Sequence, residues 1–290
     1  MKAFVILSQL KNKKMKNYIL AFIILAFIGC KNETKNDSKK EEVIMTEPDG
    51  GIGDGAVSPA VAFAKGIESA HNKTDWNNKR AVSFDISLSF GGQERLNGKV
   101  TTLTNSSKVR IDKKNGSQLI YDGNEVYLCP ANADAKGARF DMFTWQYFFA
   151  IPFKLTDPGT KWEPMESVQL NGNPYDVGKL SFENNIGDAP DDWYVVYQER
   201  ASGLLHAAAY IVTFGTEQEK AEQNPHAIVY SNYKVVEGIP IATKWSFRNW
   251  NSKDGFGDQL GEATISNIVF FNAEDSLFEE PKNSLLITKD

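Results

Sequence analysis

The chain has 290 residues and a formal net charge of −5, with 41% hydrophobic and 12% aromatic residues. Removing residues 1–29, which contain five lysines and no acidic residue, leaves a net charge of −10. A chain this acidic repels phosphate backbones. Since no local basic patch is visible, the sequence excludes nucleic acid as a partner.

The N-terminus has the order of a secretory signal. Five lysines precede an apolar run over residues 18–28, and Gly29-Cys30 follows the run. The run is about half the ~20 residues that a membrane-spanning helix needs, so we expect residues 1–29 to be a signal peptide that is removed. Met15 is an alternative start to Met1, because Lys16 and Asn17 already supply a short charged lead.

Gly29-Cys30 at the end of the apolar run resembles a bacterial lipobox, although Phe27 and Ile28 differ from its commonest form. We therefore expect acyl chains on Cys30 and a lipid-anchored protein of the cell envelope, at the outer membrane on its periplasmic or surface face. An ordinary signal peptide with a chance cysteine is the alternative. Acylation leaves Cys129 without a disulfide partner in the chain, and its apolar neighbours predict a small buried side chain.

Residues 30–55 are polar, charge-mixed and then glycine-rich, with too few apolar side chains to build a core. They predict a disordered tether. Gly-Ile-Gly-Asp-Gly at 51–55 lacks the preceding strand and the Lys-Ser/Thr of a phosphate loop, so we assign it to this linker. Residues 56–290 are of ordinary size for one β-rich domain, which we expect to be monomeric.

The elements of this domain follow from hydrophobic periodicity. Ser58 as N-cap and Pro59 at the first helical position predict a helix that ends near Ala70. Residues 80–90 alternate apolar and polar side chains and are the clearest half-buried strand. Short polar breaks separate further expected strands at 96–104, 108–113, 117–121, 125–129, 161–170, 175–182, 191–199, 204–214, 226–236, 240–250 and 260–271.

This order of elements predicts a mainly β (α+β) fold, a large curved antiparallel sheet or half-barrel with helices packed on its concave side. Residues 139–150 form the second expected helix, with aromatic side chains on two stripes. Such a helix is buried on most sides, either as a core helix or as a plug that lines or gates an apolar cavity. One stripe holds Phe140, Phe143 and Tyr147, and the other holds Trp145, Phe148 and Phe149.

If inward-facing aromatic and aliphatic side chains surround a pocket, they bind an apolar ligand. A well-packed core uses the same residue types, and a cavity above ~300 Å³ lined by aromatics would separate the two interpretations. The candidate ligand-binding residues are Phe84, Ile86, Leu88, Trp145, Phe148, Phe149, Trp245 and Phe247.

Signals for other chemistry are weak. His71, His206 and His226 have no spacing that brings two of them onto one metal ion. The acidic turn 187–192 lacks the pattern of a calcium loop and predicts a solvated turn. No nucleophile elbow, catalytic Cys/His signature or dinucleotide fingerprint is present, so we expect no enzyme activity, cofactor or metal. Catalytic carboxylate pairs are brought together only by folding and cannot be recognised in a sequence. An envelope hydrolase with such a pair is therefore an alternative.

The order helix, curved sheet, helix and more sheet behind a lipobox resembles the half-barrel carriers and receptors of the lipoprotein-sorting (LolA/LolB-like) class. The hairpin of residues 121–128 is similar to the D-G-x-x-x-Y hairpin frequent in that class, here Asp122-Gly123 and Tyr127. Residues 149–159 are similar to a segment of bacterial lipoproteins with that fold. The resemblance covers roughly residues 57–271.

The resemblance implies a hydrophobic cavity between sheet and helices that accepts acyl chains, without catalysis. The chain differs from the soluble carrier by its own lipid anchor, and from the receptor by lacking an obvious exposed apolar loop. We therefore expect a non-enzymatic lipoprotein that binds a lipid or other apolar molecule rather than a sorting factor. The alternatives are the envelope hydrolase and a purely structural lipoprotein with a closed core.

Overall fold

The computed structural model describes residues 57–170 and 172–289, all of which belong to one unit, Glu47–Asp290. The signal peptide expected at residues 1–29, the lipidation site Cys30 and the tether expected at 30–55 lie outside the described residues.

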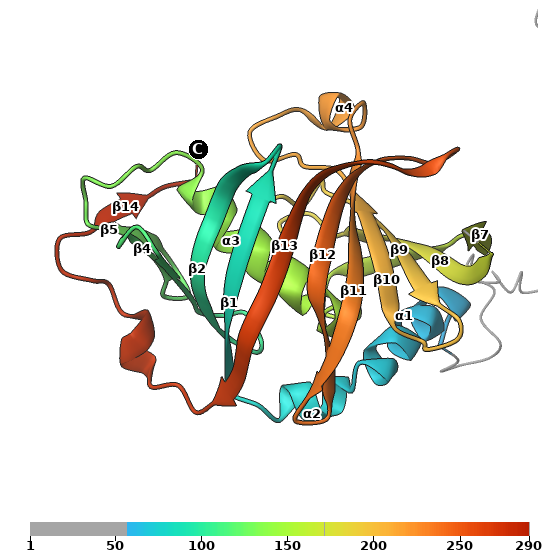
Figure 1. The fold of residues 1–290 in the computed structure, drawn as a ribbon, viewed down its shortest axis with the longest axis horizontal. Helices are drawn as coiled ribbons and strands as arrows, with labels where there is room; N and C mark the ends of the chain where they lie inside the picture. Colours follow the sequence, from blue (N-terminus) through green and yellow to red (C-terminus); the bar gives the residue numbers. More distant parts are fainter. Residues whose placement is uncertain (1–56, 171, 290) are drawn as a thin grey trace, which may run out of the picture. The chain divides into compact units, whose positions relative to one another are not determined.

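A single antiparallel sheet of 14 strands dominates the described residues (Figure 1). Its strands are β1 (Ala81–Phe90), β2 (Gln93–Leu103), β3 (Val109–Lys113), β4 (Gln118–Tyr121), β5 (Val126–Cys129), β6 (Thr160–Pro164), β7 (Val168–Leu170), β8 (Asn173–Phe182), β9 (Tyr194–Glu199), β10 (Leu205–Tyr210), β11 (His226–Val236), β12 (Ile239–Asn251), β13 (Gly255–Phe271) and β14 (Leu285–Ile287).

The strand order joins two meanders through the pairing of β1 with β13. It runs β14-β5-β4-β3-β2-β1-β13-β12-β11-β10-β9-β8-β6, and β7 also pairs with β8. The register from Ala81↔Phe271 to Phe90↔Gly261 places the Phe90 ring over a glycine. A Cβ at Gly261 would collide with the Ser89 carbonyl oxygen and this ring, so only glycine fits the close approach.

Helices cover one face of the sheet. Figure 1 shows α3 passing behind the central strands, with α1 and α2 beside one end of the sheet. This is the curved half-barrel with helices on its concave side that the sequence predicted. The helices are α1 (Pro59–Ala70), α2 (Lys73–Asn77), α3 (Ala138–Ala150), η1 (Ile151–Phe153), α4 (Gln218–Ala221) and η2 (Asp275–Phe278).

Most expected elements are found within a few residues of their predicted bounds. Ser58 caps α1, since its Oγ accepts a hydrogen bond from the Val61 N–H at 3.3 Å. The strand expected at 161–170 is wrong as one element, because β6 ends at Pro164, which has no N–H to donate, and β7 starts again at Val168. The strand expected at 204–214 already ends at Tyr210.

His71 fastens the end of α1 to the sheet. It is fully buried, and its Nε2 accepts a hydrogen bond from the Leu205 N–H at 3.0 Å. The proton therefore sits on Nδ1, which donates to the Pro240 carbonyl oxygen at 3.1 Å. Burial lowers the pKa of His71 to about 4, and the bond to Pro240 opposes this shift only in part. The ring is thus neutral and structural.

The buried ring makes the free energy of unfolding pH-dependent. The His71 side chain has a pKa of 6.5 in the unfolded chain and of about 4 in the folded chain. The contribution of the neutral ring to the free energy of unfolding is therefore complete above pH 6.5 and is lost as the pH falls towards 4. The loss should reach about 3 kcal/mol. Urea unfolding at several pH values should show the advantage of wild type over His71→Gln shrinking across this window. A stability difference between wild type and His71→Gln that stays constant with pH would contradict this prediction.

Candidate functional site

Helix α3 has two aromatic stripes with different environments. Trp145, Phe148 and Phe149 are 3–4% exposed and belong to the main core, where Phe149 stacks on Phe84 of β1 with ring centroids 3.9 Å apart. The other stripe, with Phe143 and Tyr147, is only half-buried and lines a cavity. The helix is therefore both a core helix and the wall of a cavity, which joins the two interpretations left open by the sequence.

Asp141 fixes how α3 is rotated. Its carboxylate is fully buried and accepts hydrogen bonds from the Trp145 indole N–H at 2.9 Å and from the Lys113 ammonium of β3 at 3.0 Å. Arg95 of β2 contacts both carboxylate oxygens, at 2.7 and 3.1 Å. Because a buried carboxylate is tolerated only when paired and hydrogen-bonded, this cluster holds one side of α3 against β2 and β3.

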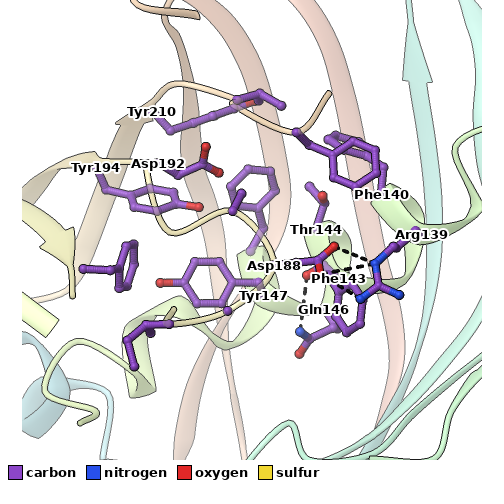
Figure 2. A pocket seen from close by; sticks show the side chains of 17 residues that line it. Arg139, Phe140, Phe143, Thr144, Gln146, Tyr147, Asp188, Asp192, Tyr194 and Tyr210 are labelled. Carbon is purple, nitrogen blue, oxygen red and sulfur yellow. Dashed lines mark hydrogen bonds and ion pairs between the residues drawn. The ribbon is translucent and has the colours of Figure 1, made fainter. Parts of the chain in front are cut away.

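On the other side of α3 lies a cavity of about 220 Å³ that is partly open to solvent (Figure 2). Aromatic and aliphatic side chains form most of its surface, with polar groups between them. Its lining residues are Arg139, Phe140, Phe143, Thr144, Gln146, Tyr147, Phe148, Phe182, Ile186, Gly187, Asp188, Ala189, Asp192, Tyr194, Tyr210, Val212 and Phe214.

The loop between β8 and β9 covers part of this cavity and is tied to α3. Arg139 and Asp188 form a two-point ion pair, with Nε–Oδ2 at 2.9 Å and Nη2–Oδ1 at 2.8 Å, and each side chain is 14% exposed (Figure 2). Such paired, directional contacts are the strongest ion pairs in proteins. The solvated turn expected at 187–192 is found only in part: Gly187 and Asp191 are exposed, whereas Asp188 is held by Arg139 and Asp192 by Thr213.

Asp192 lies two residues before β9, with its carboxylate largely buried. Its Oδ1 accepts hydrogen bonds from the Thr213 N–H at 2.7 Å and from the Thr213 hydroxyl at 2.8 Å. Burial raises the pKa of Asp192 to about 6, against the lowering effect of these two bonds. Thr213 lies three residues beyond the end of β10, outside the sheet.

Three tyrosine hydroxyls share this cavity with Asp192. The Tyr147 and Tyr194 rings lie 5.6 Å apart and the Tyr194 and Tyr210 rings 6.2 Å apart, between centroids. Burial raises the pKa of each of the three, and the Asp192 carboxylate contributes to each rise. Figure 2 shows Asp192 on the same side of the cavity as Tyr147 and Tyr194, away from the Arg139–Asp188 pair.

The ligand-binding residues predicted from the sequence pack in the core, and only one of them borders the cavity beside α3. All eight are at most 4% exposed and lie in the main core. Phe148 borders the 220 Å³ cavity, while Phe149 and Trp245 border only a second one of about 10 Å³. Their role in ligand binding stays a prediction. The members placed in the core away from both cavities are Phe84, Ile86, Leu88, Trp145 and Phe247.

Other candidate features have structural surroundings. In residues 57–170 and 172–289, no group of three or more His, Cys, Asp or Glu side chains is placed to hold a metal ion. His206, on β10, packs against the Tyr175 ring with centroids 4.5 Å apart. Cys129, expected to be buried, is half-buried and unpaired with any other described cysteine. No helix in the same part of the chain has both the length and the apolar character to span a membrane.

Solved structures share this arrangement of sheet and helices. A LolA superfamily protein from Nitrosomonas europaea aligns with a TM-score of 0.51 and 9% identity, covering 76% of this chain and 97% of that one. A DUF1329 family protein from Desulfovibrio piger aligns with a TM-score of 0.50 and 12% identity, over 76% and 97%. No protein-family model and no curated protein matches the chain. The chain thus has a LolA-like fold, which confirms the predicted resemblance at the level of the fold.

Proposed function

We propose that the protein is a membrane-anchored extracytoplasmic lipoprotein that binds a lipid or other apolar molecule in the cavity beside α3, without catalysing a reaction. The observation that carries the proposal is the cavity itself, with its aromatic walls and its buried polar groups. Concave, mostly apolar sites with a few polar groups are typical of small-molecule binding. The LolA-like fold supports a half-barrel that can hold such a ligand.

The size of the cavity limits what it can enclose. At about 220 Å³ it is smaller than the ~300 Å³ at the low end of ligand sites, which taken alone favours a closed-core lipoprotein. Two other features favour a ligand: the cavity is partly open to solvent, and polar side chains with unused hydrogen-bonding capacity line it. We therefore propose that the cavity holds one end of an amphiphile, with the remainder at its opening.

The hydrolase alternative receives less support from the geometry. Two carboxylates line the cavity, but Asp188 is occupied by the two-point contact with Arg139, and Asp192 accepts both of its observed hydrogen bonds from Thr213. The cavity surface around them is mainly apolar rather than a polar cleft. A general acid and base need room for a substrate or water between them, and the ion pair occupies one of the two groups.

The ligand proposal is tested by native mass spectrometry of the mature chain carrying Cys30→Ser, which removes the protein's own acyl chains. Burial of each CH₂ contributes about 0.8 kcal/mol. A ligand that buries only part of an acyl chain should therefore bind with micromolar affinity and stay bound through purification. We expect a small bound mass that organic extraction releases, and uptake of the uncharged fluorophore N-phenyl-1-naphthylamine. A protein that carries nothing and takes up no fluorophore would support the closed-core alternative.

The anchor is proposed from the residues before the described part: a signal peptide at 1–29, acylated Cys30 and a tether over 30–55 that joins the membrane to one domain. Mass spectrometry of the mature protein should find an acylated N-terminal cysteine at position 30. Cys30→Ala should release the protein from the membrane or stall its export. Membrane retention of a correctly cleaved Cys30→Ala form would count against the anchor.

A further inference from the structure

The charged groups of the cavity leave no free cation among the described residues that line it. Arg139 is the one lysine or arginine in that lining. Its Nε and Nη2 contact Asp188, and its Nη1 donates to the Ile287 carbonyl oxygen at 3.3 Å. Lys289, which does not line the cavity, also lies near this pair, with its Nζ 3.8 Å from Asp188 Oδ1. Both cations therefore contact Asp188, and no ion pair among the described residues reaches Asp192.

Two hydrogen-bond acceptors of residues that line the cavity have no partner among the described residues. Asp192 uses Oδ1 for both bonds from Thr213, and its Oδ2 has no partner among the described residues. Gln146 is 5% exposed, and its Oε1 also lacks a partner there, although its Nε2 donates to the Phe143 carbonyl oxygen at 3.3 Å. Gln146 Oε1 is a buried acceptor without a donor, which costs free energy, and Asp192 Oδ2 can accept a further hydrogen bond, so a ligand that supplies a donor is favoured.

From this arrangement we infer that the cavity selects amphiphiles whose polar end is uncharged and donates a hydrogen bond, such as a long-chain alcohol or a glyceride, over fatty-acid anions of the same chain length. The inference rests on the proposed function and specifies its ligand class.

An anionic head group would meet the wrong charge. The hydroxyls of Tyr147, Tyr194 and Tyr210 could donate to a carboxylate, but that carboxylate would share the polar region with Asp192 and would find no free cation. Like charges that share a partly buried site repel each other. A hydroxyl, in contrast, can donate to Asp192 or Gln146 and accept from a tyrosine. Since burial raises the pKa of Asp192 only to about 6, the group is a carboxylate at pH 8.

The test measures displacement of N-phenyl-1-naphthylamine from the mature Cys30→Ser chain at pH 8 by decanol and by decanoate. Any apolar site prefers decanol to some extent, so the informative readout is the effect of Asp192→Asn, whose amide oxygen can still accept from Thr213. We expect this variant to bind decanoate several-fold more tightly, on the order of tenfold, with little change for decanol. Asp191→Asn, at an exposed neighbouring acid, is the matched control and should change neither ligand.

Gln146→Leu provides an independent variant, because it removes an acceptor without changing the charge. This variant should lower the affinity for decanol several-fold. The affinity for decyl methyl ether, which has no hydrogen-bond donor, should not change. Decanoate affinity that is equal in wild type and Asp192→Asn, or that rises equally in Asp191→Asn, would overturn the inference while the proposed function stands. If neither the fluorophore nor any of these amphiphiles binds, the proposed function fails as well.

Discussion

Replacing Arg95 and Lys113 together with methionine should lower the free energy of unfolding by about 3–5 kcal/mol, because the buried carboxylate of Asp141 would then keep only the Trp145 indole as a partner. Asp141 is fully buried, whereas the side chains of Arg95 and Lys113 are 35% and 17% exposed. The uncompensated charge would therefore remain inside the protein. Urea unfolding followed by circular dichroism measures the loss.

The same cluster should be replaceable as a whole. Adding Asp141→Leu to the double variant removes the buried charge, and apolar replacement of a buried ionic cluster is often neutral or stabilising, so most of the lost free energy should return. Arg200→Met is the matched control, since the Arg200–Asp176 pair is exposed and its loss should hardly move the urea midpoint. A triple variant that is no more stable than the double variant would show that Asp141 is not the source of the loss.

The sequence predicted the fold because its signals are local and periodic. The alternation in residues 80–90 and the cap at Ser58 each set one element, and the short polar breaks set the hairpins between strands. The pairing of β1 with β13 could not be predicted in this way, since its partners lie more than 170 residues apart, as in Ala81↔Phe271. The sequence did not predict the short strand β14 either, because three residues carry little periodicity.

The site was predicted less well, and α3 shows why. Both of its aromatic stripes were recognised, but the sequence does not say which stripe faces the sheet. Asp141 decides this through Arg95 and Lys113, two residues on strands more than 25 positions away. The candidate ligand-binding residues on this helix were taken from the stripe that packs in the core, whereas Phe143 and Tyr147 on the other stripe line the cavity.

The acidic turn at 187–192 shows a second limit. Three carboxylates in a glycine- and proline-containing segment are typical of a solvated turn, and the partners of two of them, Arg139 and Thr213, are distant in sequence. Burial of Asp192 among three tyrosines depends on how β9 and β10 pair, for example Tyr210↔Tyr194. One signal was available: aromatic residues are frequent both in α3 and in the segments that line the cavity, such as Phe182 and Phe214.

Alanine variants at one residue from each aromatic environment should separate stability from binding. Phe84 is fully buried and stacks on Phe149, so Phe84→Ala should cost about 3–5 kcal/mol of the free energy of unfolding. Phe143 is partly exposed and borders the cavity, so Phe143→Ala should cost less. Affinity for N-phenyl-1-naphthylamine should change little in Phe84→Ala but fall roughly tenfold in Phe143→Ala, where a wall of the cavity is lost.

Phe148 gives the decisive intermediate case, because it borders the cavity and also packs against Phe247 and Tyr210, with ring centroids 6.1 and 4.9 Å away. Phe148→Ala should therefore reduce both stability and affinity. Binding is measured on folded protein well below the unfolding transition, and Phe84→Leu replaces Phe84→Ala if the latter does not fold. If affinity falls in proportion to stability across all three positions, the cavity beside α3 is not the binding site. Loss of affinity confined to Phe143 and Phe148 would instead place the ligand against α3, in the cavity that both residues border.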